Sequence, residues 1–139
     1  MRALTEALAR HTEAAPEIVV VHGVAGLVHD FYTGIEKALR TVGQGLEGSL
    51  PTGDAWHRDL LRSATLTLPG VRPPVLGVET AERLTDFLAF RHLYRNLYAF
   101  NLRWPRVRAL ALEVADVWPA PRADLAAFAT FLDELAAGV

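Results

Sequence analysis

Apolar side chains recur along this chain at three-, four- and seven-residue spacing, which is the spacing of one face of an α-helix. The clearest example runs from about Glu17 to Leu46, where an apolar seam repeats every seven residues. Its members are Val21, Val28, Ile35 and Val42, with Val24, Phe31, Ala38 and Leu39 between them. Such a seam is typical of a long helix within a bundle and predicts one here.

A second long helix is predicted from Glu79 to about Phe100, and its pattern changes halfway along. The first half places Leu84, Phe87 and Leu88 on one side, as expected for a core stripe. The same side then carries polar and aromatic residues: Arg91, Tyr94, Arg95 and Tyr98. A break in an otherwise consistent pattern is typical of a functional site on a scaffold helix.

Four shorter helices complete the prediction. The first covers Met1 to about Ala15, the second follows Asp54 as its N-cap, and the third begins near Pro105 and ends near Trp118. The last has an apolar stripe and a glycine past its end: Leu125, Phe128, Leu132, Leu135 and Gly138. Prolines predict a loop at 69–74 and a break at 119–121.

No segment alternates with a period of two residues, so no β-strand is predicted. The fold class that follows is all-α, an up-and-down helical bundle with a four-helix core and additional short helices. With 139 residues, no internal repeat and no long linker, the chain is expected to form one domain over residues 1–139.

Charge adds one feature to this picture. The formal net charge is -2, so affinity for nucleic acid would have to come from a local patch. Residues 91–108 supply one, because RHLYRNLYAFNLRWPRVR contains five arginines and four aromatic residues but no carboxylate. Guanidinium groups can hold phosphate and aromatic rings can stack on bases, although the same segment could also form a helix–helix contact in a dimer.

Several other function classes are disfavoured. The absence of cysteine excludes disulfides, thiolate metal sites and a cysteine nucleophile. His29, Asp30, Tyr32 and Glu36 lie close together along one helix, but no further ligand completes a metal site, and no cofactor motif is found. The N-terminus is charged throughout, and the longest apolar run, 18–21, is too short to cross a membrane. A cytoplasmic protein is therefore expected.

Four sequence blocks resemble the HepT-like proteins, small helical bundles of the HEPN superfamily, in order and spacing. They are HDFYTGIEKAL (29–39), LPTGDAWHRDLL (50–61), PGVRPPVL (69–76) and FRHLYRNLYAFNLRW (90–104). The resemblance covers about residues 20–110. It implies a toxin of a type VII toxin–antitoxin pair, encoded beside an MntA-type minimal nucleotidyltransferase. It also implies a homodimer whose facing motifs form a metal-independent ribonuclease cleft, silenced in some members by attachment of AMP to a motif tyrosine.

The family motif, R-x4-H-x-Y, falls on Arg91, Asn96 and Tyr98. By the resemblance, Arg91 contacts phosphate and Tyr98 accepts AMP. Arg95 and Arg103 of the basic segment, together with Arg91, are candidate nucleic-acid-binding residues. The histidine is replaced by Asn96, whose amide does not transfer protons near neutral pH. Loss of general acid–base help costs roughly 10²- to 10⁴-fold in rate. His92 lies one helical turn before Asn96 and is a possible substitute.

Three hypotheses remain open at this point. The first is a HepT-like protein that binds a nucleotidyltransferase and accepts AMP on Tyr98, with weak or absent ribonuclease activity. The second is an active ribonuclease that uses Arg91 together with Asn96 or His92. The third is a helical interaction protein without any activity on nucleotides. Trp56 and His57 are interpreted as a buried tryptophan beside a hydrogen-bonded histidine, and Tyr94 as a packing residue.

Overall fold

A computed structural model describes residues 2–11, 16–96 and 102–138, and within these residues the fold is helical. Its elements are α1 (Arg2–Arg10), α2 (Ile18–Val42), the π-helical turn η1 (Gly43–Glu47), α3 (Trp56–Ser63), α4 (Val78–Asn96), α5 (Trp104–Val117) and α6 (Pro119–Ala137). The one β-type contact among the described residues is an isolated bridge between Leu68 and Arg72, in the loop between α3 and α4. The prediction of an all-α helical bundle is confirmed.

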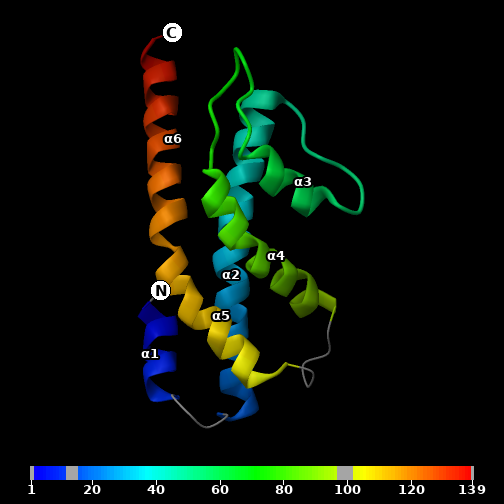
Figure 1. Cartoon of the computed structure of the whole chain (residues 1–139), viewed down its shortest axis with the longest axis vertical. Helices are drawn as coiled ribbons and strands as arrows, with labels where there is room; N and C mark the ends of the chain where they lie inside the picture. The colour runs from blue at the N-terminus through cyan, green and yellow to red at the C-terminus, as the bar shows by residue number, and fades with distance from the viewer. Residues whose placement is uncertain (1, 12–15, 97–101, 139) are drawn as a thin grey trace.

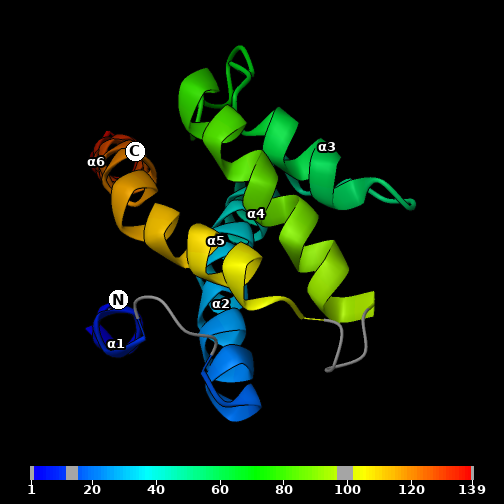
Figure 2. The ribbon, with the colours of Figure 1, turned by 60° about the horizontal axis from the view of Figure 1, so that its bottom comes forward.

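The helix α2 forms the axis of the molecule. It runs through the centre in both views, with α1 and α6 on one side, α3 and α4 on the other, and α5 crossing it (Figures 1 and 2). The predicted seam is confirmed at Val21, Val28 and Ile35, which are buried, while Val42 is half-buried. Because α2 packs against four other helices, most of its apolar side chains are in contact with the core.

The continuous segment from Ile18 to Glu47 is long and apolar enough to cross a membrane if only length and composition are considered. The central helix of a bundle meets the same criteria, since its buried face must be apolar along its whole length. Here that face packs against α1, α3, α4 and α5. This packing buries 33% of the most apolar stretch of the segment.

Aromatic residues of α4 fill the space beside α2. Phe87 and Phe90 are almost completely buried, and the ring of Phe31 on α2 meets that of Phe87 edge-on at a centroid distance of 5.2 Å. The helix α5 adds Val107, Leu110 and Val114 to the same core. Full burial of such side chains stabilises a fold by about 1.5–3 kcal/mol each, so this cluster fixes how α4 lies across α2.

The structure corrects several details of the sequence prediction. The helix α1 ends at Arg10 rather than near Ala15, and residues 12–15 lie outside the described part. Asp54 does not cap α3, because that helix begins at Trp56 and its N-terminus has no side-chain hydrogen bond. Leu135 is 42% exposed, because the last turns of α6 extend beyond the packed core (Figure 1).

The break between the last two helices is shorter than predicted from the prolines at 119–121. Only Trp118 separates α5 from α6, and Pro119 begins the new helix. Proline is tolerated in the first turn because its missing N–H would have no intrahelical partner there. Residues 119–121 therefore form the first turn of α6, and the break between the helices lies at Trp118.

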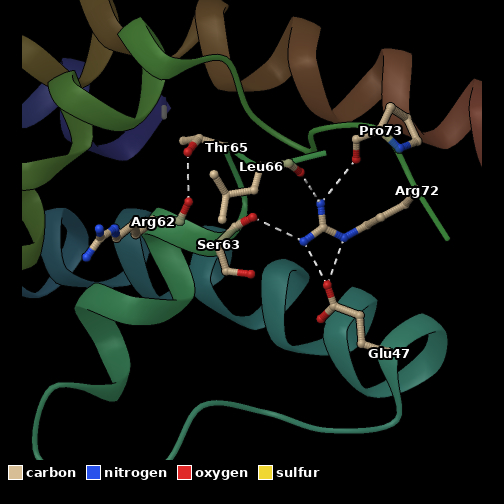
Figure 3. A network of polar contacts seen from close by, with 7 residues as sticks. All are labelled: Glu47, Arg62, Ser63, Thr65, Leu66, Arg72 and Pro73. Carbon is tan, nitrogen blue, oxygen red and sulfur yellow. Dashed lines mark hydrogen bonds and ion pairs between the residues drawn. The ribbon is translucent and has the colours of Figure 1, made fainter. Parts of the chain in front are cut away.

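The loop at 69–74 is confirmed, and a buried arginine holds it in place. The Arg72 side chain is 3% exposed, and its Nε and Nη2 lie 2.9 and 2.7 Å from Glu47 Oε1 (Figure 3). Nη1 donates to the carbonyls of Leu66 and Pro73, and Nη2 donates to that of Ser63. This one guanidinium thus joins η1, the end of α3 and the loop before α4.

The start of α4 is held by a residue of α6. Asp124 accepts hydrogen bonds from the backbone N–H of Gly77, at 2.9 Å, and from the Thr80 hydroxyl, at 2.7 Å. A carboxylate at a helix N-terminus satisfies a free N–H group and interacts favourably with the helix dipole. Asp124 therefore performs for α4, from a distant part of the chain, the role predicted for Asp54 at α3.

Replacing Arg72 with methionine is expected to destabilise the protein by about 3–5 kcal/mol. The reason is that Glu47 and three carbonyl groups lose their buried hydrogen-bond donor. Urea denaturation followed by circular dichroism measures this change. Arg83→Met is the matched control. Arg83 pairs with Asp116 at the surface, with side chains 45% and 78% exposed, so a change of at most about 0.5 kcal/mol is expected. Equal effects of the two variants would show that the Arg72 network does not stabilise the fold.

Candidate functional site

Arg91, the arginine of the sequence motif, lies at the crossing of α2 and α4 and is buried. Its side chain is 9% exposed and faces Glu36 of α2, which is 6% exposed, and His57 in the first turn of α3. The three residues thus come from three different helices. A charged side chain is costly to bury unless it is paired, and this arrangement pairs one cation with one anion.

The distances define a chain of contacts. Glu36 Oε2 lies 2.8 Å from His57 Nδ1, and His57 Nε2 lies 3.2 Å from Arg91 Nη1. Arg91 Nε is 3.3 Å from Glu36 Oε1, close enough for an ion pair, but its N–H makes no hydrogen bond of good geometry. The hydrogen bond to His57 is therefore the more directional of the two contacts that orient the guanidinium.

Tyr32 lies one turn before Glu36 on α2 and is 1% exposed. Burial raises the pKa of its phenol far above the ordinary value of 10.0, and the negative charge of Glu36 raises it further. The positive charge of Arg91 acts in the opposite direction with a smaller effect. Tyr32 is consequently a neutral residue at the base of the cluster.

Arg91 also lines a groove of about 720 Å³ between α2 and α4. The groove contains four cationic side chains and one carboxylate, together with hydroxyl and amide groups. Its lining residues are Thr33, Glu36, Lys37, Arg40, Thr41, Gln44, Gly45, Leu50, Arg91 and Arg95. Since Glu36 is already occupied by His57 and Arg91, the groove has an excess of positive charge in a chain whose net charge is -2.

Trp56 connects the buried cluster to the rim of this groove. Its ring centroid is 3.4 Å from that of His57, and the guanidinium carbon of Arg40 lies 5.0 Å from the ring. A cation over an aromatic face is stabilised by about 0.5–2 kcal/mol, depending on its exposure. The prediction of a hydrogen-bonded His57 is confirmed, whereas Trp56 is half-buried rather than buried.

The groove brings together only some of the predicted site residues. Arg91 and Arg95 both line it. His92 and Arg103 are exposed, and neither is among the described residues that line the groove. Asn96 is the last residue of α4, but its side chain and the whole of Tyr98 lie outside the described residues.

Four residues of this site were not identified from the sequence as parts of it: Glu36, Lys37, Arg40 and His57. Glu36 was considered only as a metal ligand, and His57 only as a hydrogen-bonded histidine beside a buried tryptophan. One signal was present, because Glu36 follows Tyr32 by one turn beside the apolar seam of α2, where a carboxylate needs a buried partner. The sequence could not indicate that the partner would be Arg91.

No group of three or more histidine, aspartate or glutamate side chains suited to a metal ion occurs among the described residues. The predicted neighbours His29 and Glu36 make other contacts. The His29 ring lies 4.8 Å from that of Tyr94, which packs against the core as expected, and Glu36 binds His57 and Arg91.

A second hollow, of about 350 Å³, lies between α1, α2, α5 and α6 and has a different character. Its lining is almost entirely apolar: Leu4, Leu27, Asp30, Phe31, Gly34, Ile35, Val114, Trp118 and Leu125. With one carboxylate and no cation, it is unsuited to an anion. The basic groove is therefore the better candidate for a phosphate-containing ligand.

A comparison with known protein families adds one finding. The family described as "HepT-like protein" matches residues 23–132, which include the helices of the groove and the buried cluster. No curated protein and no solved structure matches the chain.

The raised pKa of Tyr32 predicts a specific loss of stability in alkali. Above about pH 10 the phenol ionises in the unfolded chain but not in the folded one, so the free energy of unfolding falls by up to about 1.4 kcal/mol per pH unit from this group. Below about pH 10 the phenol is protonated in both states, so Tyr32 does not make the free energy of unfolding depend on pH. Urea denaturation between about pH 9 and pH 11 should give a steeper fall for the wild type than for Tyr32→Phe. Parallel slopes would contradict this origin.

Proposed function

The chain belongs to the HepT-like protein family, and on that premise we propose that it is the toxin-type partner of a minimal nucleotidyltransferase. In this proposal the basic groove holds phosphate groups, and cleavage of RNA is weak or absent. The observation that carries the proposal is the position of Arg91. The motif arginine is fixed in a buried cluster and forms one wall of a groove that also contains Lys37, Arg40 and Arg95.

Phosphate is the ligand chemistry that these residues fit. Arginine presents several N–H donors in a planar fork that matches phosphate oxygens, and Lys37 adds a compact charge. The groove draws its cations from two helices, so it can contact successive phosphates along a chain as well as a single group. Thr33, Thr41 and Gln44 offer further hydrogen bonds along its length.

We expect weak or absent cleavage because of the proton-transfer groups near Arg91. Cleavage of RNA through the 2'-hydroxyl needs a base to take its proton and an acid to protonate the leaving 5'-oxygen. Asn96, at the motif position, supplies neither. His57 is the imidazole in contact with Arg91, but both of its ring nitrogens are occupied, one by Glu36 and one by Arg91.

The remaining parts of the proposal come from the family. Two copies are proposed to form a homodimer through the C-terminal region of α4, in the cytoplasm and away from membranes. The nucleotidyltransferase is proposed to transfer AMP to Tyr98, which follows the last residue of α4 by two positions. The cations of the groove support this step, because Arg91 and Arg95 lie in the last two turns of the same helix and can stabilise an adjacent phosphate.

An active ribonuclease is the second candidate. The observation that favours it is the imidazole of His57, 3.2 Å from the motif arginine. If substrate displaced Arg91 from Nε2, the Glu36–His57 pair would resemble the carboxylate–imidazole pairs that act as general bases. A helical interaction protein remains the third candidate and predicts neither phosphate binding nor modification.

The AMP acceptor can be identified directly. Incubation with the nucleotidyltransferase encoded beside the gene, ATP and magnesium should increase the mass of the intact protein by one or more AMP groups. Tyr98→Phe should abolish the increase, whereas Tyr94→Phe should retain it, because Tyr94 packs against the core. Intact-protein mass spectrometry measures both. An unmodified wild-type protein, with a nucleotidyltransferase active on other substrates, would refute the pairing.

Cleavage provides a separate prediction. Wild-type protein should degrade single-stranded RNA slowly or not at all, and Asn96→His should raise the rate by roughly 10²-fold or more, because it restores a proton-transfer group. Gel analysis of labelled RNA at neutral pH measures the rate, with Asn96→His/Arg91→Lys as the control that should lose the gain. Rapid wild-type cleavage that disappears in Arg91→Lys would establish the active ribonuclease instead.

A further inference from the structure

We infer that His57 is a positioning residue: in its neutral form, with the proton on Nδ1, it fixes the Arg91 guanidinium at the groove. The inference rests on the proposed phosphate-binding function, since it concerns how the same groove is prepared for its ligand. It assigns a role to a residue that the family motif does not contain.

The tautomer follows from what each group can donate. Arginine is always protonated and has no acceptor, so a contact of 3.2 Å between Arg91 Nη1 and His57 Nε2 needs a lone pair on Nε2. The imidazole proton must then be on Nδ1, where it is donated to Glu36 Oε2 at 2.8 Å. An imidazolium would instead place two N–H donors against each other at Nε2.

This arrangement holds Arg91 in one orientation. The ion pair with Glu36 supplies attraction, but at 3.3 Å its geometry gives no hydrogen bond, and so it restrains the plane of the guanidinium poorly. The hydrogen bond from Nη1 to His57 Nε2 restrains the orientation of the guanidinium plane. A long side chain that is ordered before the ligand arrives loses less conformational entropy on binding, so the restraint favours affinity.

His57 is itself held on two sides. Glu36 fixes one ring nitrogen, and the Trp56 ring covers the imidazole at a centroid distance of 3.4 Å. Because Arg40 lies over Trp56, the same short segment of α3 supports two of the four cations of the groove. The cluster of Glu36, neutral His57 and Arg91 has no net charge, and this limits the cost of burying it.

Two substitutions separate the bonds of His57. Glutamine can place its amide oxygen near the position of Nε2 and so keep an acceptor for Arg91. Asparagine is shorter and reaches only the position of Nδ1, which keeps the bond to Glu36 and loses the bond to Arg91. If His57 only supported the fold, the two variants would bind ligand with equal affinity as long as both are folded.

The probe is a short, fluorescein-labelled single-stranded RNA, and its dissociation constant is measured by anisotropy at fixed, low salt. His57→Gln should bind within about 2-fold of the wild type, whereas His57→Asn should bind about 10-fold more weakly, the effect expected for one hydrogen bond to a charged group. Circular dichroism confirms that each variant is folded at the temperature of the assay. Equal affinities of the two folded variants would overturn the positioning role.

A measurement without ligand tests the tautomer in the wild-type protein. Long-range ¹H–¹⁵N correlation spectra near neutral pH distinguish the two neutral tautomers and the imidazolium, and the His57 signals are assigned as those missing from His57→Gln. The expected result is neutral His57 protonated on Nδ1. A proton on Nε2, or a doubly protonated imidazolium, would refute the inference whatever affinities the variants show.

Different results would contradict the phosphate-binding groove and the positioning role of His57. If wild-type protein does not bind the RNA, or if Arg91→Lys binds as tightly as the wild type, the proposed function of the groove is wrong, and the positioning role has no ligand to act on. If Arg91→Lys weakens binding but His57→Asn does not, the groove stands and the role of His57 is refuted.

Discussion

The burial of an ion pair between Arg91 and Glu36 is the constraint on which the site depends. Two charged groups can leave water only if they are paired and their remaining hydrogen-bonding groups are largely satisfied. Here this brings three helices together, because α4 provides the cation, α2 the anion and α3 the imidazole that joins them. The crossing of α2 and α4 is thus determined by polar contacts as well as by the aromatic core beside it.

The two buried arginines of this fold, Arg72 and Arg91, have different surroundings. Arg72 has bonds to a carboxylate and to three carbonyl groups, and its role is to join segments of the chain. Among the described residues, Arg91 contacts Glu36 and His57, and it lies at the wall of a basic groove. Burial alone therefore does not separate a structural arginine from one proposed to bind a ligand; the difference lies in the groove that the second guanidinium lines.

Much of the fold could be predicted from the sequence because its signals are local. The apolar seam of α2 and the prolines at 69–74 determine local structure by periodicity and by backbone restriction. The position of Leu135 could not be predicted, because an apolar stripe does not reveal where the neighbouring elements end. The capping of α4 by Asp124 likewise depends on a contact between residues 47 positions apart.

The candidate site was predictable to a similar extent. Arg91 and Arg95 were identified because they interrupt an apolar stripe within a single helix. Lys37, Arg40 and His57 were not, because their role depends on how α2, α3 and α4 pack, and no spacing within one helix contains that information. The motif at Asn96 and Tyr98 rests on the family resemblance.

The π-helical turn η1 has a consequence for the comparison of related chains. A π-helical turn accommodates one more residue than an α-helical turn, and such turns are frequent at functional sites. Without the extra residue, Gly43–Glu47 would continue as regular α-helix, and Glu47 would rotate by about 100° around the axis. Its carboxylate would then point away from Arg72. A relative with a one-residue deletion here should therefore also have lost the arginine of the following loop, so the two changes should be inherited together.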